Sequence, residues 1–235
     1  MQRLLTRIVE SCAVGRASAR PLGLKPDLQL IALLLFLLPA TVHAGAQLYE
    51  PLSASVRASL YKAVSDSIPR HMAFSSAVEE ANWLGEMSRR LEKRMPDQST
   101  RHNFLKSVHY EATRAGLDPQ LVLGLIQVES GFKKYAVSSA GARGFMQIMP
   151  FWVKLIGSEE NNLFHLRTNL RYGCTILRHY LDIEKGDLYR ALGRYNGSLG
   201  RPEYPTLVVG AWRNHWAYNT PGTRISSQDE KRPAS

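Results

Sequence analysis

The side chain best suited to acid–base chemistry is Glu129, which ends the apolar stretch LVLGLIQVE. Ile126, Leu125 and Val122 lie three, four and seven residues before it, so the carboxyl group continues one apolar face of a helix. Burial there disfavours the carboxylate, and the negative end of the helix dipole acts in the same direction. Both effects raise a carboxyl pKa, as a general acid near neutral pH requires. The sequence of this helix is equally compatible with a Glu129 that lies on the surface and pairs with Lys133.

Three ordered motifs accompany this helix. The segment ESGF occupies 129–132, SSAGARGFMQIMP occupies 138–150, and RYNGS occupies 194–198. Together they resemble the lytic transglycosylase (SLT) family, whose patterns are ES-x-F, S-x-x-G-A-x-G-L-M-Q-x-M-P and A-Y-N-x-G. Phe145 replaces the usual leucine of the second motif. The third motif is a partial match, because arginine stands for the alanine and serine for the last glycine.

Two weaker elements extend the resemblance. Asn169 and Gly173 fit the family's N-I-x-x-G stretch, with leucine in place of isoleucine, and Tyr204 followed by Val208 fits its closing Y-x-x-x-V. The similarity covers roughly residues 101–216. Several separate elements in the right order make it far more specific than one short motif.

The resemblance implies a goose-lysozyme-like helical domain in which Glu129 protonates the glycosidic oxygen between N-acetylmuramic acid and N-acetylglucosamine. The same group, now a carboxylate, would take the proton of the muramoyl C6 hydroxyl, which closes on C1 to leave a 1,6-anhydro end without water. Ordinary glycosidases use two carboxylates, but the next acids after Glu129 are Glu159 and Glu160, outside the motifs. The family's substrate supplies its own N-acetyl group instead. We expect a lytic transglycosylase with one acid/base and neither a metal nor a cofactor.

The resemblance also implies which side chains bind the substrate. They are Ser138, Gln147, Met149, Tyr195, Asn196 and Tyr204. Ser138 and Gln147 would hold the N-acetyl and muramoyl groups, although a serine that caps a loop and a solvent-facing glutamine would give the same sequence. Tyr195 is a candidate hydrogen-bond partner of Glu129, but a plain buried tyrosine would also fit.

Other large or reactive residues are better explained by packing. Core positions are expected for Trp152, Trp212 and Trp216. Core packing is at least as good an explanation for Met146 as cleft lining. Cys174 shares a helix face with leucines at 170, 177 and 181, so we expect it to be buried.

The sequence predicts that these residues lie on helices or in the loops between them. The predicted helices span 53–67, 75–95, 102–115, 119–130, 150–156, 163–184 and 187–195. Asp118 and Pro119 supply the cap and the first-turn proline of the helix that carries Glu129. Strand alternation is suggested only near 144–148. The predicted fold class is therefore mainly α, a lysozyme-like helical domain with a helical N-terminal extension.

The N-terminal sequence predicts export. The aliphatic run LQLIALLLFLL at 28–38 follows a basic region and precedes a small-x-small site at 42–44, as in a signal peptide; an uncleaved anchor is the alternative. The expected divisions are a signal peptide at 1–44, a helical segment at 45–100, the SLT domain at 101–218 and a disordered polar tail at 219–235. We expect the protein in the periplasm or cell envelope, without a transmembrane segment in the mature chain.

The net charge of +10, or +7 without residues 1–44, indicates a polyanionic partner. Nucleic acid, an anionic membrane face and the cell wall would all fit, and the predicted export argues against nucleic acid. The expected partners are peptidoglycan glycan strands and, as a further candidate, a cell-envelope protein complex. Alternative functions are a hydrolytic muramidase or chitin-directed enzyme on the same fold and a noncatalytic cell-wall-binding protein. No role is assigned to residues 45–100.

Overall fold

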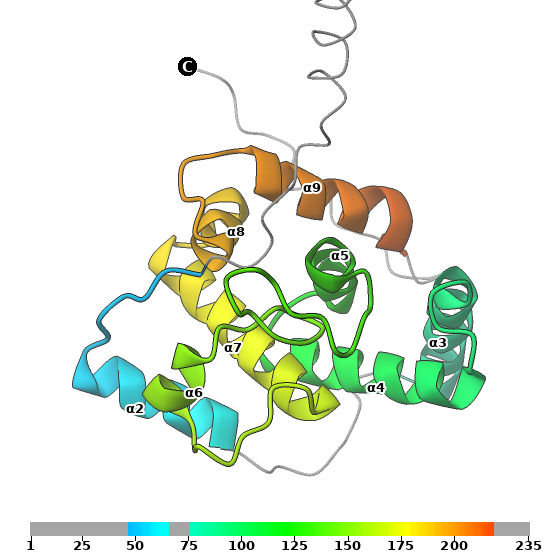
Figure 1. Cartoon of the computed structure of the whole chain (residues 1–235). Coiled ribbons are helices and arrows are strands. Elements are labelled where there is room, and N and C mark those ends of the chain that lie inside the picture. Colours follow the sequence, from blue (N-terminus) through cyan, green and yellow to red (C-terminus); the bar gives the residue numbers. More distant parts are fainter. Residues whose placement is uncertain (1–46, 66–75, 219–235) are drawn as a thin grey trace, which may run out of the picture. The chain divides into compact units, whose positions relative to one another are not determined.

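Helices make up the regular structure of the computed structural model, which describes residues 47–65 and 76–218 (Figure 1). They are α2 (Ala54–Ser65), α3 (Ala77–Leu91), α4 (Gln98–Arg114), α5 (Pro119–Ser130), α6 (Phe151–Ile156), α7 (Leu166–Ile183), α8 (Leu188–Asn196), α9 (Glu203–Ala211) and the π-helix η1 (Trp212–Trp216). The predicted mainly α class is confirmed. The expected signal peptide and polar tail lie outside the described residues.

The strand suggested near 144–148 is not formed. Two isolated antiparallel bridges take its place, joining Val137 to Arg143 and Arg143 to Ile148. Gly144 lies between the bridged residues with a φ of 78°, a left-handed conformation that turns the chain back at once. The segment is therefore a tight loop in which no regular ladder has room to form.

The boundaries of α5 are those that its sequence predicts. The side chain of Asp118 accepts a hydrogen bond from the Gln120 N–H, and Pro119 occupies the first turn. Gly131 ends the helix in the left-handed conformation, with a φ of 57°. Since the flanking residues fix both ends, the position of Glu129 in the last turn is fixed as well.

The helix α9 was not predicted as a separate element. Its sequence EYPTLVVGA contains a proline, a glycine and two adjacent valines, all poor helix formers. Pro205 lies in the first turn, however, where its missing N–H costs no hydrogen bond. Packing against α5 and α8 then stabilises a helix that local propensity alone disfavours.

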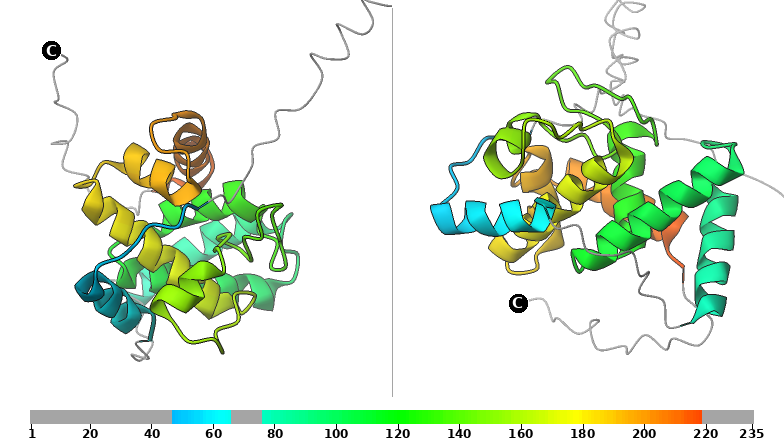
Figure 2. Two further views of the ribbon diagram at one scale, coloured as in Figure 1. Left: turned by 60° about the vertical axis from the view of Figure 1, so that its left-hand side comes forward. Right: turned by 90° about the horizontal axis from the view of Figure 1, so that it is seen from below.

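The helix α5 lies at the centre of the described fold. It contacts α4, α9 and η1, and both views of Figure 2 place it among these elements. Five of its aliphatic side chains are buried, namely Leu121, Val122, Leu123, Leu125 and Ile126. A predominantly apolar helix belongs in a core, and Glu129 is buried together with these aliphatic side chains.

The two helices before residue 95 share this core. Leu60 of α2 and Trp83, Met87 and Leu91 of α3 are buried in the same hydrophobic cluster as the later helices. The helix α2 packs on α6 and α7, whereas α3 packs on α4 and η1. The helical N-terminal extension therefore contributes to the core on which the site is built.

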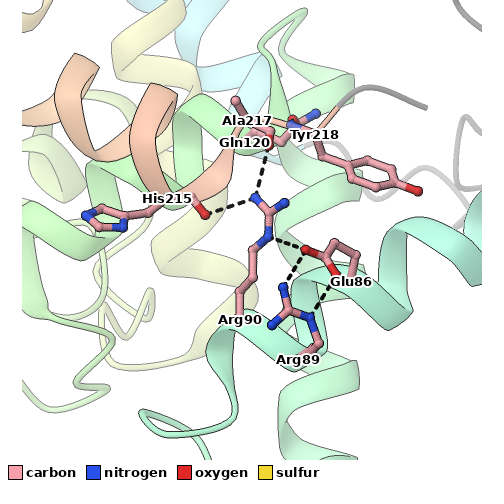
Figure 3. A network of polar contacts seen from close by, with 7 residues as sticks. All are labelled: Glu86, Arg89, Arg90, Gln120, His215, Ala217 and Tyr218. Atoms are coloured by element: carbon pink, nitrogen blue, oxygen red, sulfur yellow. Dashed lines mark hydrogen bonds and ion pairs between the residues drawn. The ribbon is translucent and has the colours of Figure 1, made fainter. Parts of the chain in front are cut away.

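An arginine on α3 holds the C-terminal end of the described chain (Figure 3). The Nη1 atom of Arg90 donates to the carbonyl oxygens of His215 and Ala217, each at 3.0 Å, and its Nε atom donates to Glu86 at 2.6 Å. These carbonyls lie at the end of η1, where backbone acceptors lack helical partners. Among the helices of the described ranges, none is long and apolar enough to cross a membrane.

Candidate active site

Glu129 is a buried carboxyl group at the end of α5, with 6% of its surface exposed. Its Oε1 atom accepts a hydrogen bond of 2.5 Å from the Tyr204 hydroxyl, and its Oε2 atom is buried without a hydrogen-bond partner. Burial raises the pKa of Glu129 from 4.5 to about 8, although the Tyr204 hydrogen bond opposes the shift. The group therefore keeps its proton at neutral pH, as a general acid must.

The predicted burial of Glu129 is confirmed, and the apolar face of α5 is its cause, as predicted. Leu125, Ile126 and Val122 are all fully buried on the same helix. The alternative of a surface pair with Lys133 is wrong, because Lys133 is exposed and Tyr204 is the partner of Glu129. The apolar face of α5 thus carries the carboxyl group into a region where charge is costly.

Of the two interpretations of Tyr195, a hydrogen-bond partner of Glu129 or a plain buried tyrosine, the structure supports the second. The hydroxyl of Tyr195 donates to the backbone oxygen of Met146 at 2.8 Å. Because α9 packs directly on α5, Tyr204 in the first turn of α9 reaches the carboxyl group. Burial and then the nearby Glu129 carboxylate raise the pKa of Tyr204 well above its usual value, so its hydroxyl remains a donor.

The residues 136–150, called the motif loop below, are anchored by Asn169 of α7. The Oδ1 atom of Asn169 accepts the Met146 N–H at 2.8 Å, and its Nδ2 atom donates to the oxygens of Leu163 at 2.8 Å and Arg143 at 2.9 Å. Both donor hydrogens of the amide are thereby used in a fully buried position. This explains physically why an asparagine stands in the motif, a role that sequence reasoning did not identify.

Two glycines allow the close approach of the motif loop to α7. A Cβ atom at Gly144 would lie 2.4 Å from the Asn169 Nδ2 atom and 2.6 Å from the Leu163 oxygen. A Cβ atom at Gly173 would lie 2.3 Å from the Met146 sulfur. Met146 is fully buried against this glycine, so the core interpretation of Met146 is confirmed.

Ser138 and Gln147 stabilise the loop on which they lie. The Ser138 Oγ atom accepts the Ala142 N–H at 3.1 Å, and the Gln147 Nε2 atom donates to the oxygens of Gly144 at 2.8 Å and Ala136 at 3.2 Å. Gln147 is buried and has a φ of 50°, an uncommon left-handed conformation for a residue with a side chain. Contacts of these two side chains with a substrate stay predictions.

The remaining predicted site residues lie on the loop and at the end of α8. Met149 is half-buried, and its N–H donates to the Oε1 atom of Gln47 at 3.2 Å. Asn196 is buried and its Nδ2 atom donates to the Ser198 Oγ atom at 3.1 Å. The structure therefore joins Glu129 directly to one predicted site residue, Tyr204.

The expected core residues are found in the core. Trp152, Trp216 and Cys174 are buried, and Trp212 is half-buried against the same cluster. The Trp216 Nε1 atom donates to the Gln127 Oε1 atom at 2.9 Å, which fixes η1 on α5. Burial, ahead of Glu111, raises the pKa of the Cys174 thiol, so this thiol is a packed side chain and not a nucleophile.

A second buried carboxylate forms ion pairs with two arginines. Glu111 is fully buried and its oxygens pair with the Arg114 Nε atom and the Arg171 Nη2 atom, each at 3.0 Å. This cluster joins α4 to α7. In the described ranges, no group of three or more His, Cys, Asp or Glu side chains is arranged to hold a metal ion.

Comparison with known proteins finds similarity to one family over part of the chain. Residues 106–204 match the family described as "Transglycosylase SLT domain", which includes Glu129, the motif loop and Tyr204. The chain is 36% identical over 88 residues to a transglycosylase of Enterobacteria phage PRD1, covering 37% of this chain and 32% of that protein. It is 34% identical over 113 residues to membrane-bound lytic murein transglycosylase C of Glaesserella parasuis, covering 41% of this chain and 31% of the relative.

The chain spans about a third of the length of these relatives. A solved structure of the 70-kDa soluble lytic transglycosylase with bulgecin A has a TM-score of 0.34 and 17% identity, covering 62% of this chain and 32% of that one. The family match includes all three motifs and ends at Tyr204 in the first turn of α9. The match to the transglycosylase SLT domain thus covers residues 106–204, a segment that includes Glu129 and its hydrogen-bond partner Tyr204.

Proposed function

We propose that this protein is a peptidoglycan lytic transglycosylase that cleaves the β-1,4 bond between N-acetylmuramic acid and N-acetylglucosamine without water. The observation that carries the proposal is the buried Glu129, whose pKa of about 8 lets it act first as an acid and then as a base. The match to the SLT domain and the names of the relatives support the reaction class.

The proposed reaction uses Glu129 twice. Its carboxylic acid gives a proton to the glycosidic oxygen as the bond to C1 of the muramoyl residue breaks, which releases the N-acetylglucosamine hydroxyl. The resulting carboxylate removes the proton of the C6 hydroxyl, and the C6 oxygen bonds to C1. The product is a 1,6-anhydromuramoyl end, and Glu129 regains its proton. The desolvation that makes the acid weak also makes its carboxylate a stronger base.

The two carboxyl oxygens of Glu129 have different environments, which suggests different roles. Oε1 is held by the Tyr204 hydroxyl, whereas Oε2 has no partner among the described residues. Tyr204 acts as a positioning residue that orients the group and stabilises the carboxylate stage.

Hydrolysis by the same fold is the alternative, and it would require a second carboxylate that activates water. In the described part of the chain, burial and Tyr204 account for the shifted pKa of Glu129, and no carboxylate neighbour contributes. The buried Glu111 is held by two arginines. These observations favour intramolecular closure by the sugar.

The proposed substrate contacts are those that the family resemblance implies. They are Ser138, Gln147, Met149, Tyr195, Asn196 and Tyr204. We propose that the protein works on the glycan strands of the cell envelope, which agrees with the name of several relatives, membrane-bound lytic murein transglycosylase C.

The test is digestion of purified peptidoglycan with the wild type, Glu129→Gln and the exposed-carboxylate control Glu159→Gln, followed by mass spectrometry of the muropeptides. We expect 1,6-anhydro products from the wild type and the control, and none from Glu129→Gln. Reducing ends as the main product would overturn nonhydrolytic cleavage. Equal activity of Glu129→Gln would overturn the assignment of the acid/base.

A further inference from the structure

The residues 47–52, called the N-terminal strap below, connect to α2 and have no helical structure (blue in Figure 1). They lie outside the SLT match, and no motif marks them. The strap nevertheless makes side-chain contacts with two elements that carry family motifs, the motif loop and α8. It is therefore bound to the parts of the fold that surround the proposed active site.

Three contacts fix the strap over its length. The Oε1 atom of Gln47 accepts the Met149 N–H at 3.2 Å. The ring of Tyr49 packs edge-on against Phe151, with 5.7 Å between the ring centroids. These two partners lie at the end of the motif loop and the start of α6, so the strap follows the chain where it leaves the loop.

The third contact is an ion pair with α8. The Oε1 atom of Glu50 lies 2.9 Å from the Nη1 atom of Arg194. The Nε atom of Arg194 pairs with Glu184. Arg194 is the residue that replaces the usual alanine of the family's A-Y-N-x-G pattern. An alanine at this position could not form the ion pair with Glu50.

Gln47 is the innermost residue of the strap, with only 4% of its surface exposed. Besides the Met149 N–H, its side chain contacts Tyr195, whose pKa is raised chiefly by burial and then by Glu129, with Gln47 acting in the opposite direction. Among the described residues, the buried Nε2 atom of Gln47 has no hydrogen-bond partner. An unpaired polar group of this kind costs free energy in a core.

The position of Gln47 completes the anchoring of the motif loop. Met146 is held by Asn169 and by Tyr195. Met149, three residues further on, is held by Gln47. Between these anchors lies Gln147 in its left-handed conformation, a predicted substrate contact. Losing the second anchor would free one end of this strained segment while the other end stays fixed.

We propose that Gln47 is a positioning residue for the active site, which holds Met149 and Tyr195 in place relative to Glu129. The N-terminal strap is then part of the catalytic unit, and the unit extends beyond the SLT domain that sequence similarity defines. This inference rests on the proposed transglycosylase function for its effect on turnover, but the anchoring of Met149 can be measured without any reaction.

The test compares three variants of the full chain with the wild type. Gln47→Ala removes the acceptor, Gln47→Glu retains an acceptor of the same length, and Leu48→Ala is the control, because Leu48 is exposed on the same strap. The measurements are amide hydrogen exchange at Met149 by NMR, kcat and KM on peptidoglycan, and the melting temperature. For Gln47→Ala we expect roughly 10-fold faster exchange at Met149 and a roughly 10-fold lower kcat. KM and the melting temperature should change little.

Gln47→Glu should retain slow exchange at Met149, and Leu48→Ala should behave as the wild type. Wild-type exchange and kcat in Gln47→Ala would overturn the inference, as would equal losses in Leu48→Ala. If Gln47→Ala does not fold, fast Met149 exchange in folded Gln47→Glu would overturn it. If even the wild type leaves peptidoglycan intact, the proposed function fails, whereas exchange at Met149 still decides the role of Gln47.

Discussion

Replacing Glu129 by glutamine should stabilise the protein at high pH, although it should abolish activity. Glutamine has nearly the same shape, and its Oε1 atom can still accept the hydrogen bond from Tyr204. The replacement therefore removes the ionisable group and leaves its surroundings in place. An acid whose pKa is raised by burial destabilises the fold once it ionises.

The magnitude follows from the pKa of Glu129, which rises from 4.5 to about 8 on folding. This shift corresponds to roughly 4–5 kcal/mol at a pH above both values. Since the folded state binds the proton more tightly, the contribution is present in full below pH 4.5 and is lost as the pH rises toward 8. Between pH 5 and pH 9, the free energy of unfolding of the wild type should fall by about 4 kcal/mol through this group.

The assay is urea denaturation of both proteins at pH 5, 7 and 9, with the free energy of unfolding extrapolated to water. Contributions of other titrating groups cancel in the difference between the two proteins. We expect the stability of Glu129→Gln relative to the wild type to grow steadily with pH, by about 4 kcal/mol over this range. If the difference in unfolding free energy between the two proteins stays constant within about 0.5 kcal/mol, the raised pKa of Glu129 is refuted. Glu129 would then have the same pKa in the folded and the unfolded state.

Three further substitutions test the support of the site. Tyr204→Phe removes the hydrogen bond that lowers the pKa of Glu129, so the alkaline limb of the pH–rate profile should move to higher pH. Asn169→Ala leaves the Met146 N–H and the Leu163 oxygen unpaired and removes one of two hydrogen bonds to the Arg143 oxygen, so it should lower the free energy of unfolding by about 3 kcal/mol in urea. Gly124→Ala would place a Cβ atom 2.8 Å from the Trp212 nitrogen, and should cost about 1–3 kcal/mol in the same assay.

Each of these predictions has an outcome that would contradict it. An unmoved or lowered alkaline limb in Tyr204→Phe would mean that the hydroxyl does not control Glu129. Wild-type stability of Asn169→Ala would mean that the motif loop is anchored elsewhere. Wild-type stability of Gly124→Ala would mean that α5 and η1 separate at little cost.

The sequence predicts those features that neighbouring residues determine. Asp118, Pro119 and Gly131 fix the ends of α5 through local hydrogen bonds and backbone conformation. The apolar residues before Glu129 predict its burial, because a helix places them on one face. Both predictions depend on residues within about two turns of helix, so a single sequence is sufficient for them.

Features that depend on how helices pack could not be predicted in this way. Tyr195 and Tyr204 both lie in family motifs, and only the contact of α9 with α5 shows that Tyr204 reaches Glu129. Gln47 lies about 100 residues from Met149 along the chain and belongs to no motif. One indication was present in the sequence, since Arg194 departs from the family pattern at the residue that pairs with the strap.

Nonhydrolytic cleavage is tested most directly by digesting purified peptidoglycan in water enriched in oxygen-18 and measuring the product masses by mass spectrometry. If Glu129 is the single acid/base of a nonhydrolytic reaction, the wild type should give 1,6-anhydromuramoyl ends that carry no oxygen-18, and Glu129→Gln should give none of these products. New muramoyl ends that each contain one oxygen-18 atom would show attack by water and would contradict nonhydrolytic cleavage.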